Sequence, residues 1–104
     1  MSAQLKILLV RPWTSGTERL RTSLRASGLT TARIVRVDFR AALYAALTWG
    51  TFDAVIYDPA TPGITADDLA AALRERCPAV PVIELDGNDD VGARLAAIMV
   101  ARRN

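Results

Sequence analysis

The expected fold is decided by the stretch Phe52-Asp53-Ala54-Val55-Ile56-Tyr57-Asp58-Pro59-Ala60-Thr61-Pro62-Gly63. Its apolar run, from Ala54 to Tyr57, is short and contains two β-branched residues, which is typical of a strand buried on both faces. Two prolines and a glycine follow Asp58 and end regular structure there. Asp58 therefore stands where the strand leaves the sheet, at the edge where open α/β sheets place their sites. A carboxylate at that position is a candidate functional group.

The composition predicts one small globular domain that spans residues 1–104. Hydrophobic residues make up 51% and charged residues 23% of the chain, which is an ordinary globular composition. The 13 basic residues nearly balance the 11 acidic ones, and the arginines are scattered over the expected elements. We therefore expect no nucleic-acid partner. The terminal pair Arg102-Arg103 is placed to complement the dipole of a last helix.

Cysteine and histidine usage excludes several classes of function. The single cysteine, Cys77, allows no intramolecular disulfide and has no histidine to act as its base, so we interpret it as a small packing residue. The lack of histidine also excludes Ser-His-Asp catalysis and histidine-ligated metals. No segment has the pattern of a signal peptide or the roughly 18 apolar residues of a membrane span. We expect a cytoplasmic, non-enzymatic protein with no metal, no cofactor and no membrane contact.

Strand and helix patterns alternate along the chain. Apolar runs that end at turn signals predict strands, and apolar residues three or four apart predict helices. Thr65 and Asp68 have the spacing of a capping box at the start of the third helix. The expected strands cover residues 5–10, 32–38, 54–57 and 80–85, and the helices begin near residues 17, 41, 65 and 89. This β-α alternation predicts an α/β fold, in which right-handed crossovers join a parallel sheet with helices on both faces.

Four places in the chain match the pattern of one protein family. They are Lys6–Val10, Ala41–Leu47, Pro78–Ile83, and the run Phe52–Asp58 with the Thr61-Pro62-Gly63 that follows it. The last is the most specific, because it sets an aspartate at a strand end with Pro-Gly four and five residues later. In these places the chain resembles the receiver domain of bacterial two-component response regulators. The resemblance implies a flavodoxin-like sheet in the order 2-1-3-4, as a degenerate (pseudo-)receiver of four β-α units without the family's fifth strand and helix.

The resemblance assigns Asp58 to the position of the aspartate that accepts a phosphoryl group. The family holds the required Mg²⁺ with an acidic pair directly after the first strand, and this chain has Arg11 and Pro12 there. Asp86 stands where the family has a serine or threonine. The family also has a lysine at the end of a fifth strand, and we expect no fifth strand in this sequence. Ordinary Mg²⁺-dependent phosphorylation is therefore not expected.

Two interpretations of Asp58 remain open. In the first, Arg11 bridges Asp58 and Asp86, so that a fixed ion pair takes the place of both the metal and the lysine. In the second, Asp58 only accepts backbone N–H groups within its loop. Trp13 and Thr61 are also expected to line this site. Trp13 either closes the pocket as a contact anchor or covers the end of the first helix.

Two other aromatic residues are expected to pack against the body of the domain. Trp49 follows the apolar stripe of the second helix, so we place it in the core or at its rim. Tyr57 lies inside the central strand, so we place it in the core. Neither is expected to serve the site.

The sheet is expected to lack full cover. Without a fifth strand, the strand over residues 80–85 is an open apolar edge. With four helices, the sheet face over the first and third strands is expected to stay partly bare. We expect a homodimer, or docking on another protein, through the fourth strand and last helix, with interface candidates Val82, Glu84, Val91, Leu95, Ile98 and Met99. The alternative is a compact monomer in which the last helix moves into the uncovered space.

Three functions are weighed. We expect a non-catalytic, receiver-like module that acts in signalling or transcriptional control through protein–protein contacts. The alternative is a phosphoacceptor that uses Asp58 with Asp53 or Asp86 as unusual Mg²⁺ ligands, although Asp53 is expected at the opposite end of the strand. The third is a small enzyme or nucleotide binder, in which residues 14–16 hold an anion at a helix N-terminus. The chain has no Gly-rich phosphate loop after its first strand to support the third function.

Overall fold

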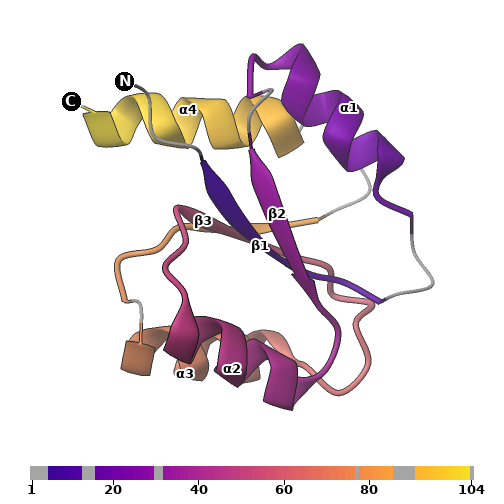
Figure 1. Ribbon diagram of the computed structural model, residues 1–104, viewed down its shortest axis with the longest axis vertical. Coiled ribbons are helices and arrows are strands. Elements are labelled where there is room, and N and C mark those ends of the chain that lie inside the picture. Colours follow the sequence, from indigo (N-terminus) through magenta and orange to yellow (C-terminus); the bar gives the residue numbers. More distant parts are fainter. Residues whose placement is uncertain (1–4, 13–15, 30–31, 77, 86–90, 104) are drawn as a thin grey trace.

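Strands and helices alternate four times along the chain, as the sequence predicts. The computed structural model describes residues 5–12, 16–29, 32–76, 78–85 and 91–103. The elements are β1 (Lys6–Val10), α1 (Glu18–Ala26), β2 (Arg33–Val37), α2 (Arg40–Trp49), β3 (Ala54–Tyr57), α3 (Ala66–Arg76), β4 (Val82–Glu84) and α4 (Val91–Arg103) (Figure 1). All neighbouring strands pair in parallel, in the order β2-β1-β3-β4. The fold is therefore the α/β, flavodoxin-like arrangement that the sequence predicts.

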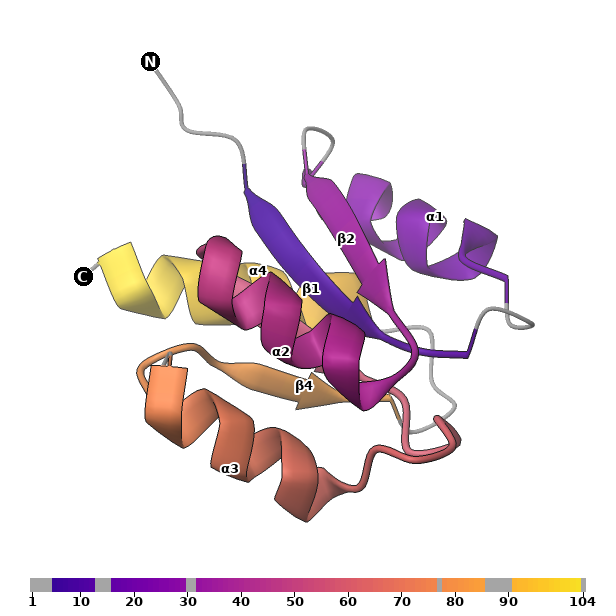
Figure 2. The ribbon, with the colours of Figure 1, turned by 60° about the horizontal axis from the view of Figure 1, so that its bottom comes forward.

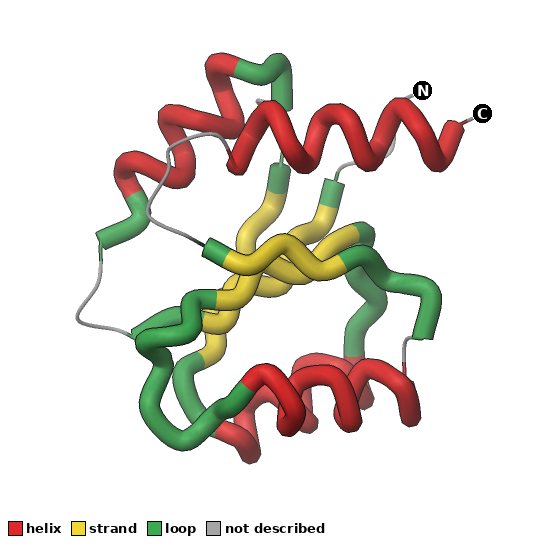
Figure 3. Tube along the Cα trace, turned by 180° about the vertical axis from the view of Figure 1, so that it is seen from behind, coloured by secondary structure: helices red, strands yellow, loops and turns green. Residues whose placement is uncertain are grey.

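The helices lie on both faces of the sheet, with α1 and α4 on one face and α2 and α3 on the other (Figure 3). The step from β1 to β2 runs one way across the sheet, and the steps from β2 to β3 and from β3 to β4 run the other way. Because all three crossovers are right-handed, α1 lies on one face while α2 and α3 lie on the other. No crossover constrains α4, since no described strand follows it, and it lies beside α1 (Figures 1 and 3).

The core forms two apolar layers, one on each face of the sheet. Alternate residues of β1 and β3 point to opposite layers, and Ile7 to Val10 and Ala54 to Ile56 are completely buried. The layer under α2 and α3 includes Leu43, Leu47, Leu69 and Leu73, and the layer under α1 and α4 includes Leu20, Leu24, Val91 and Leu95. The expectation of a partly bare face over β1 and β3 is therefore wrong. The last helix covers that face together with α1.

Close contact between α1 and α4 depends on Gly92. Its N–H donates to the hydroxyl of Ser23 at 2.8 Å, so a side chain of α1 satisfies one of the unpaired N–H groups in the first turn of α4. A Cβ atom on Gly92 would collide with the backbone carbonyl of Ser23. The sequence reasoning missed this contact, because only the paired helices show why a glycine stands in the first turn of α4.

The predicted capping box at the start of α3 is confirmed. The N–H of Asp68 donates to the Thr65 hydroxyl at 3.1 Å, and the N–H of Thr65 donates to the Asp68 carboxylate at 3.0 Å. These hydrogen bonds to Thr65 hold the pKa of Asp68 below its ordinary value. The box fixes the first turn of α3, and therefore where the chain re-enters regular structure after the loop that follows Asp58.

The two aromatic predictions have opposite outcomes. Tyr57 is 4% exposed and its hydroxyl donates to the carbonyl of Ile64 at 2.8 Å. Burial, with smaller effects from nearby carboxylates, raises the pKa of Tyr57. Trp49, in contrast, is 87% exposed, so the prediction that it packs is wrong. At about 100° per residue, Trp49 lies roughly 200° around the helix from Leu47, which is on the buried side.

Candidate functional site

The candidate site lies where β1 and β3 end side by side. Val10 is the register partner of Tyr57, so the residues that follow, Arg11 and Asp58, leave the sheet at the same level. The N–H of Asp58 donates to the carbonyl of Val10 at 2.8 Å, and the N–H of Arg11 donates to the carbonyl of Val37 at 3.1 Å. The sheet ladder therefore fixes both backbones, and the two side chains start from adjacent, rigid positions.

Asp58 is held by the turn that it begins. Its Oδ1 accepts the N–H of Ala60 at 2.9 Å, and its carbonyl accepts the N–H of Thr61 at 3.0 Å. Pro59 presets the backbone at the second position of this turn. The interpretation that Asp58 accepts loop N–H groups is therefore correct for one carboxylate oxygen.

The other carboxylate oxygen of Asp58 pairs with Arg11. Arg11 Nε lies 3.2 Å from Asp58 Oδ2, and the two side chains are only 24% and 14% exposed. Among the described residues, the buried Nε makes no aligned hydrogen bond, so the contact is a charge pair in a partly buried place. Asp58 therefore accepts a loop N–H at one oxygen and pairs with Arg11 at the other, which is more than the second interpretation allows. Whether Arg11 also reaches Asp86 stays a prediction, because Asp86 lies outside the described residues.

Thr61 belongs to the wall of the site and is buried. It is 4% exposed, and its hydroxyl lies 2.7 Å from the carbonyl of Asp58 and 3.3 Å from that of Val10. A hydroxyl has one hydrogen, so the shorter contact, to Asp58, is its main hydrogen bond. Thr61 therefore ties the turn to the end of β1, and its hydroxyl is already engaged by the backbone.

A second guanidinium reaches the same edge of the sheet. Arg36, near the end of β2, donates from its terminal nitrogen to the carbonyl of Pro12. The sequence reasoning placed Pro12 at the site and missed Arg36. The signal was available, because parallel pairing sets Arg36 opposite Leu9, one residue short of the strand end. Trp13, the other residue expected here, lies outside the described residues.

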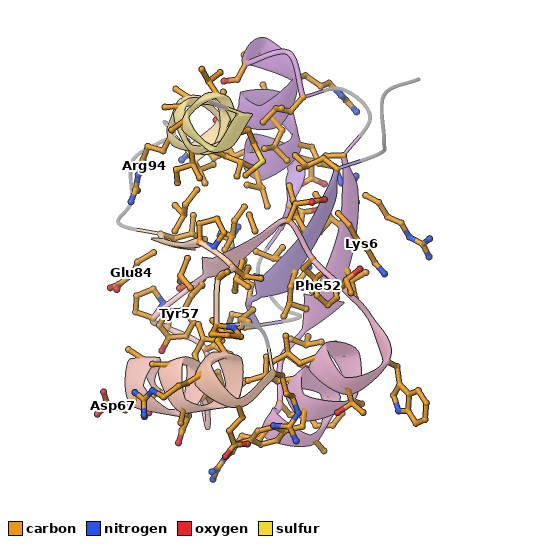
Figure 4. All side chains as sticks on the ribbon, turned by 90° about the vertical axis from the view of Figure 1, so that its left-hand side faces the viewer. Lys6, Phe52, Tyr57, Asp67, Glu84 and Arg94 are labelled. Carbon is orange, nitrogen blue, oxygen red and sulfur yellow. The ribbon has the colours of Figure 1, made fainter. Side chains whose placement is uncertain are left out.

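These groups do not fit a divalent cation. A Mg²⁺ site needs several carboxylate or carbonyl oxygens, and the positions next to Asp58 hold a guanidinium and a proline. In the part of the chain that the structure describes, no three acidic or cysteine residues gather where a metal ion would bind. Asp53, one alternative ligand, accepts the N–H of Lys6 at 2.8 Å at the opposite end of the sheet. Figure 4 shows that end, where the Lys6 ammonium lies 5.0 Å from the centre of the Phe52 ring.

The expected interface residues divide into exposed and buried groups. Val82 is 45% exposed, Glu84 is exposed, and Ile98 and Met99 are half-buried against the core. Val91 and Leu95 are 3% and 0% exposed, so the structure places them in the core instead of on a docking surface. They were expected at the interface because the sequence pattern shows a stripe and does not show what the stripe packs against.

The open edge of β4 is short and partly covered. β4 has three residues, and the carbonyl of Glu84 accepts the guanidinium of Arg94 at 3.2 Å. Figure 4 shows Glu84 and Arg94 at this edge of the molecule. The N–H of Leu85 and the carbonyl of Pro81 bond to β3, so the backbone groups of Val82 and Glu84 point outward. An arginine of α4 thus occupies one of the few unpaired acceptors along this edge.

The start of α1 gives little support to the third function, a small enzyme or nucleotide binder. Residues 14 and 15 lie outside the described residues, and Gly16 is exposed. Thr17 stands at the N-cap of α1 and makes no side-chain capping hydrogen bond among the described residues. Nothing described there is a built anion site.

The comparisons with known proteins leave the family open. No protein-family model matches the chain, and no curated protein is similar to it. Among the described residues, no helix combines the length and the apolar character that a membrane span requires. The fold and the geometry of the site therefore have to carry the functional argument.

Proposed function

We propose that this chain is a receiver-like interaction module, which works in regulation through protein–protein contacts and is not phosphorylated by the Mg²⁺-dependent route. One observation carries the proposal: both oxygens of the Asp58 carboxylate are engaged, one by the Ala60 N–H and the other by Arg11. A carboxylate that accepts a phosphoryl group needs an oxygen directed at the donor and a cation to neutralise the incoming charge. In this chain the cation is a fixed guanidinium.

The Arg11 pair supports a permanently held site. A bound Mg²⁺ can leave and return, whereas the guanidinium of Arg11 is covalently attached to the chain directly after β1. A metal ion brought to Asp58 Oδ2 would have to displace the guanidinium and would meet its charge. We therefore assign Arg11 the role of a built-in counter-ion that keeps Asp58 in one state.

Protein contact through β4 and α4 is the second half of the proposal. Of the predicted interface residues, Val82 and Glu84 are exposed on the strand, and Ile98 and Met99 are half-buried on the helix. A short apolar edge beside a partly apolar helix suits a protein partner or a second copy of the chain.

A small phosphodonor tests whether Asp58 can be phosphorylated. The protein is incubated with acetyl phosphate and Mg²⁺, and the intact mass is measured, with a phosphorylatable receiver domain in a parallel reaction as the control. We expect no mass addition, and the Asp58→Asn variant should behave in the same way. Addition of one phosphoryl group to the wild type and none to Asp58→Asn would favour the phosphoacceptor alternative.

A further inference from the structure

Charge is divided unevenly between the two parts of the chain. Residues 1–40 contain eight lysine and arginine residues and two acidic residues, whereas residues 41–104 contain five basic and nine acidic residues. The first part forms β1, α1 and β2, and β2 is an edge strand. Figure 2 shows β2 beside β1, at the edge of the sheet away from β4. Part of this excess of positive charge lies on α1 and β2, at one edge of the sheet.

Three arginines give this edge its exposed charge. Arg21 and Arg25 are one turn apart on α1, and Arg33 begins β2; all three side chains are exposed. Across the described parts of the chain, none of the three makes an ion pair or a hydrogen bond through its guanidinium. Their charges are therefore available to a partner.

The backbone of β2 offers hydrogen-bonding groups at the same place. The N–H of Arg33 donates to the carbonyl of Leu5, so the backbone N–H and C=O groups of the odd-numbered residues of β2 point toward β1. Strand alternation then directs the N–H and C=O of Ile34, and those of Ala32 just before β2, to the outer side. With five residues, β2 is a longer template than the three-residue β4.

A small hollow lies directly beside this stretch of backbone. It has a volume of about 50 Å³ and is lined by Arg21, Leu24, Arg25, Leu29, Ala32 and Ile34. Its lining combines four aliphatic residues with two of the exposed arginines. A strand added along Ile34 would direct alternate side chains toward this hollow, as happens when peptides join a sheet edge.

We propose that the outer edge of β2 binds an extended, acidic segment of a partner protein, which adds to the sheet as a further strand. The backbone of Ala32 and Ile34 supplies the ladder. Arg21 and Arg25 select for carboxylate side chains on the α1 face of the added strand, and Arg33 selects for them on the opposite face, to which strand alternation directs it. Backbone groups give such complexes their affinity, and charge complementarity gives them register and speed of association.

Other occupants fit this edge less well. Two copies joined through β2 would bring two positively charged edges together, and like charges disfavour that pairing. Single-stranded nucleic acid would meet the arginines, but the hollow has no aromatic side chain on which bases could stack. An extended peptide is the only one of the three that can use both the charges and the strand edge.

This inference deepens the proposed function by naming a kind of partner, and it uses residues far from Asp58. Failure of peptide binding would leave the phosphodonor result unchanged, and phosphorylation of Asp58 would leave the β2 edge unchanged. The two ideas are therefore tested separately.

The binding test compares four probes. A fluorescein-labelled peptide of about ten residues with alternating Glu and Val is titrated with the protein and followed by anisotropy. The controls are a Lys-Val peptide of the same length, the Glu-Val peptide N-methylated at alternate residues, and a single-stranded DNA. We expect the unmodified acidic peptide to bind about tenfold or more tightly than each control, with affinity that falls as salt rises.

Variants locate the site on the protein. The change Arg21→Glu with Arg25→Glu should weaken the acidic peptide at least about tenfold. Arg74→Glu, the same kind of substitution at one exposed arginine of α3, should leave binding unchanged. On binding, the amide of Ile34 should exchange more slowly with solvent, because it gains a hydrogen bond.

Several results would overturn the proposal. Equal binding of the N-methylated peptide would exclude strand addition, and it does so without relying on any variant that fails to fold. No binding of the acidic peptide, or equal binding of the Lys-Val peptide, would exclude the acidic partner. Tighter binding of the DNA would make nucleic acid the occupant, and protection of amides elsewhere would exclude this edge.

Discussion

The carboxylate of Asp58 makes two different contacts, and two substitutions distinguish their contributions to stability. Asp58→Asn keeps an oxygen for the Ala60 N–H and removes the charge that pairs with Arg11. Asp58→Ala removes both. For a pair that is only partly buried, we expect the free energy of unfolding to fall by about 1 kcal/mol for Asn and about 2 kcal/mol for Ala, measured by urea denaturation.

A double-mutant cycle with Arg11→Gln controls that prediction. If the two charges interact, Asp58→Asn should cost less in the Arg11→Gln background than in the wild type. Glu75→Gln serves as the surface control, because it breaks the exposed pair with Arg76 and should change stability by about 0.5 kcal/mol or less. Strictly additive effects of Arg11→Gln and Asp58→Asn would contradict the ion pair as a stabilising contact.

The residues of the site differ in how far sequence alone predicts them. Asp58 was found because the apolar run before it and the Pro-Gly after it are local signals. Arg36 was missed because its contact with Pro12 depends on the pairing of β2 with β1, and Trp49 was misplaced because its helical position was not followed around the axis. Local patterns predict a residue's backbone position well, and its contacts only where those contacts are also local.

At the scale of elements, Gly92 decides how closely α4 approaches α1. Helix propensity alone predicts that Gly92→Ala stabilises the protein by about 1 kcal/mol. The added Cβ would instead collide with the Ser23 carbonyl. We expect Gly92→Ala to lower the free energy of unfolding by about 1–3 kcal/mol, since the two helices must move apart. Thermal or urea unfolding followed by circular dichroism measures the change and its sign.

Ser23→Ala provides the matched control for the helix contact. It removes the hydroxyl that accepts the Gly92 N–H and leaves the carbonyl in place. It should therefore cost some stability alone, about 1 kcal/mol, and it should not rescue Gly92→Ala. A Gly92→Ala variant as stable as the wild type would show that α1 and α4 are not in the close contact described.

The elements also show where sequence patterns reach their limit. The start of α3 was predictable from Thr65 and Asp68, because a capping box is built from residues three apart. The place of α4 was left between two alternatives, an interface and the uncovered face of the sheet, because its stripe of Val91 and Leu95 fits any apolar surface. The structure sets that stripe against β1 and β3, which removes it from the expected interface.

For the whole molecule, the covered sheet changes the expectation for self-association. With both faces of β1 and β3 buried, the β4 edge and the outer side of α4 are the parts of the predicted interface that remain exposed. The unpaired backbone groups there belong to two residues, Val82 and Glu84, and Arg94 already occupies the carbonyl of Glu84. A strand edge that offers so few free backbone groups is a weak template for pairing with a second copy.

We therefore expect a weak homodimer that forms through β4 and is seen only at high protein concentration. Light scattering should give the monomer mass in dilute solution and a rising mass as concentration increases. Val82→Lys places a charge at the start of β4 and should abolish the rise, while Ala45→Lys, on the exposed side of α2, should not. A rise that persists in Val82→Lys would place the contact elsewhere. A monomer mass at every concentration would contradict the homodimer. The physical reason would be that the apolar groups that a dimer needs are already buried inside the fold.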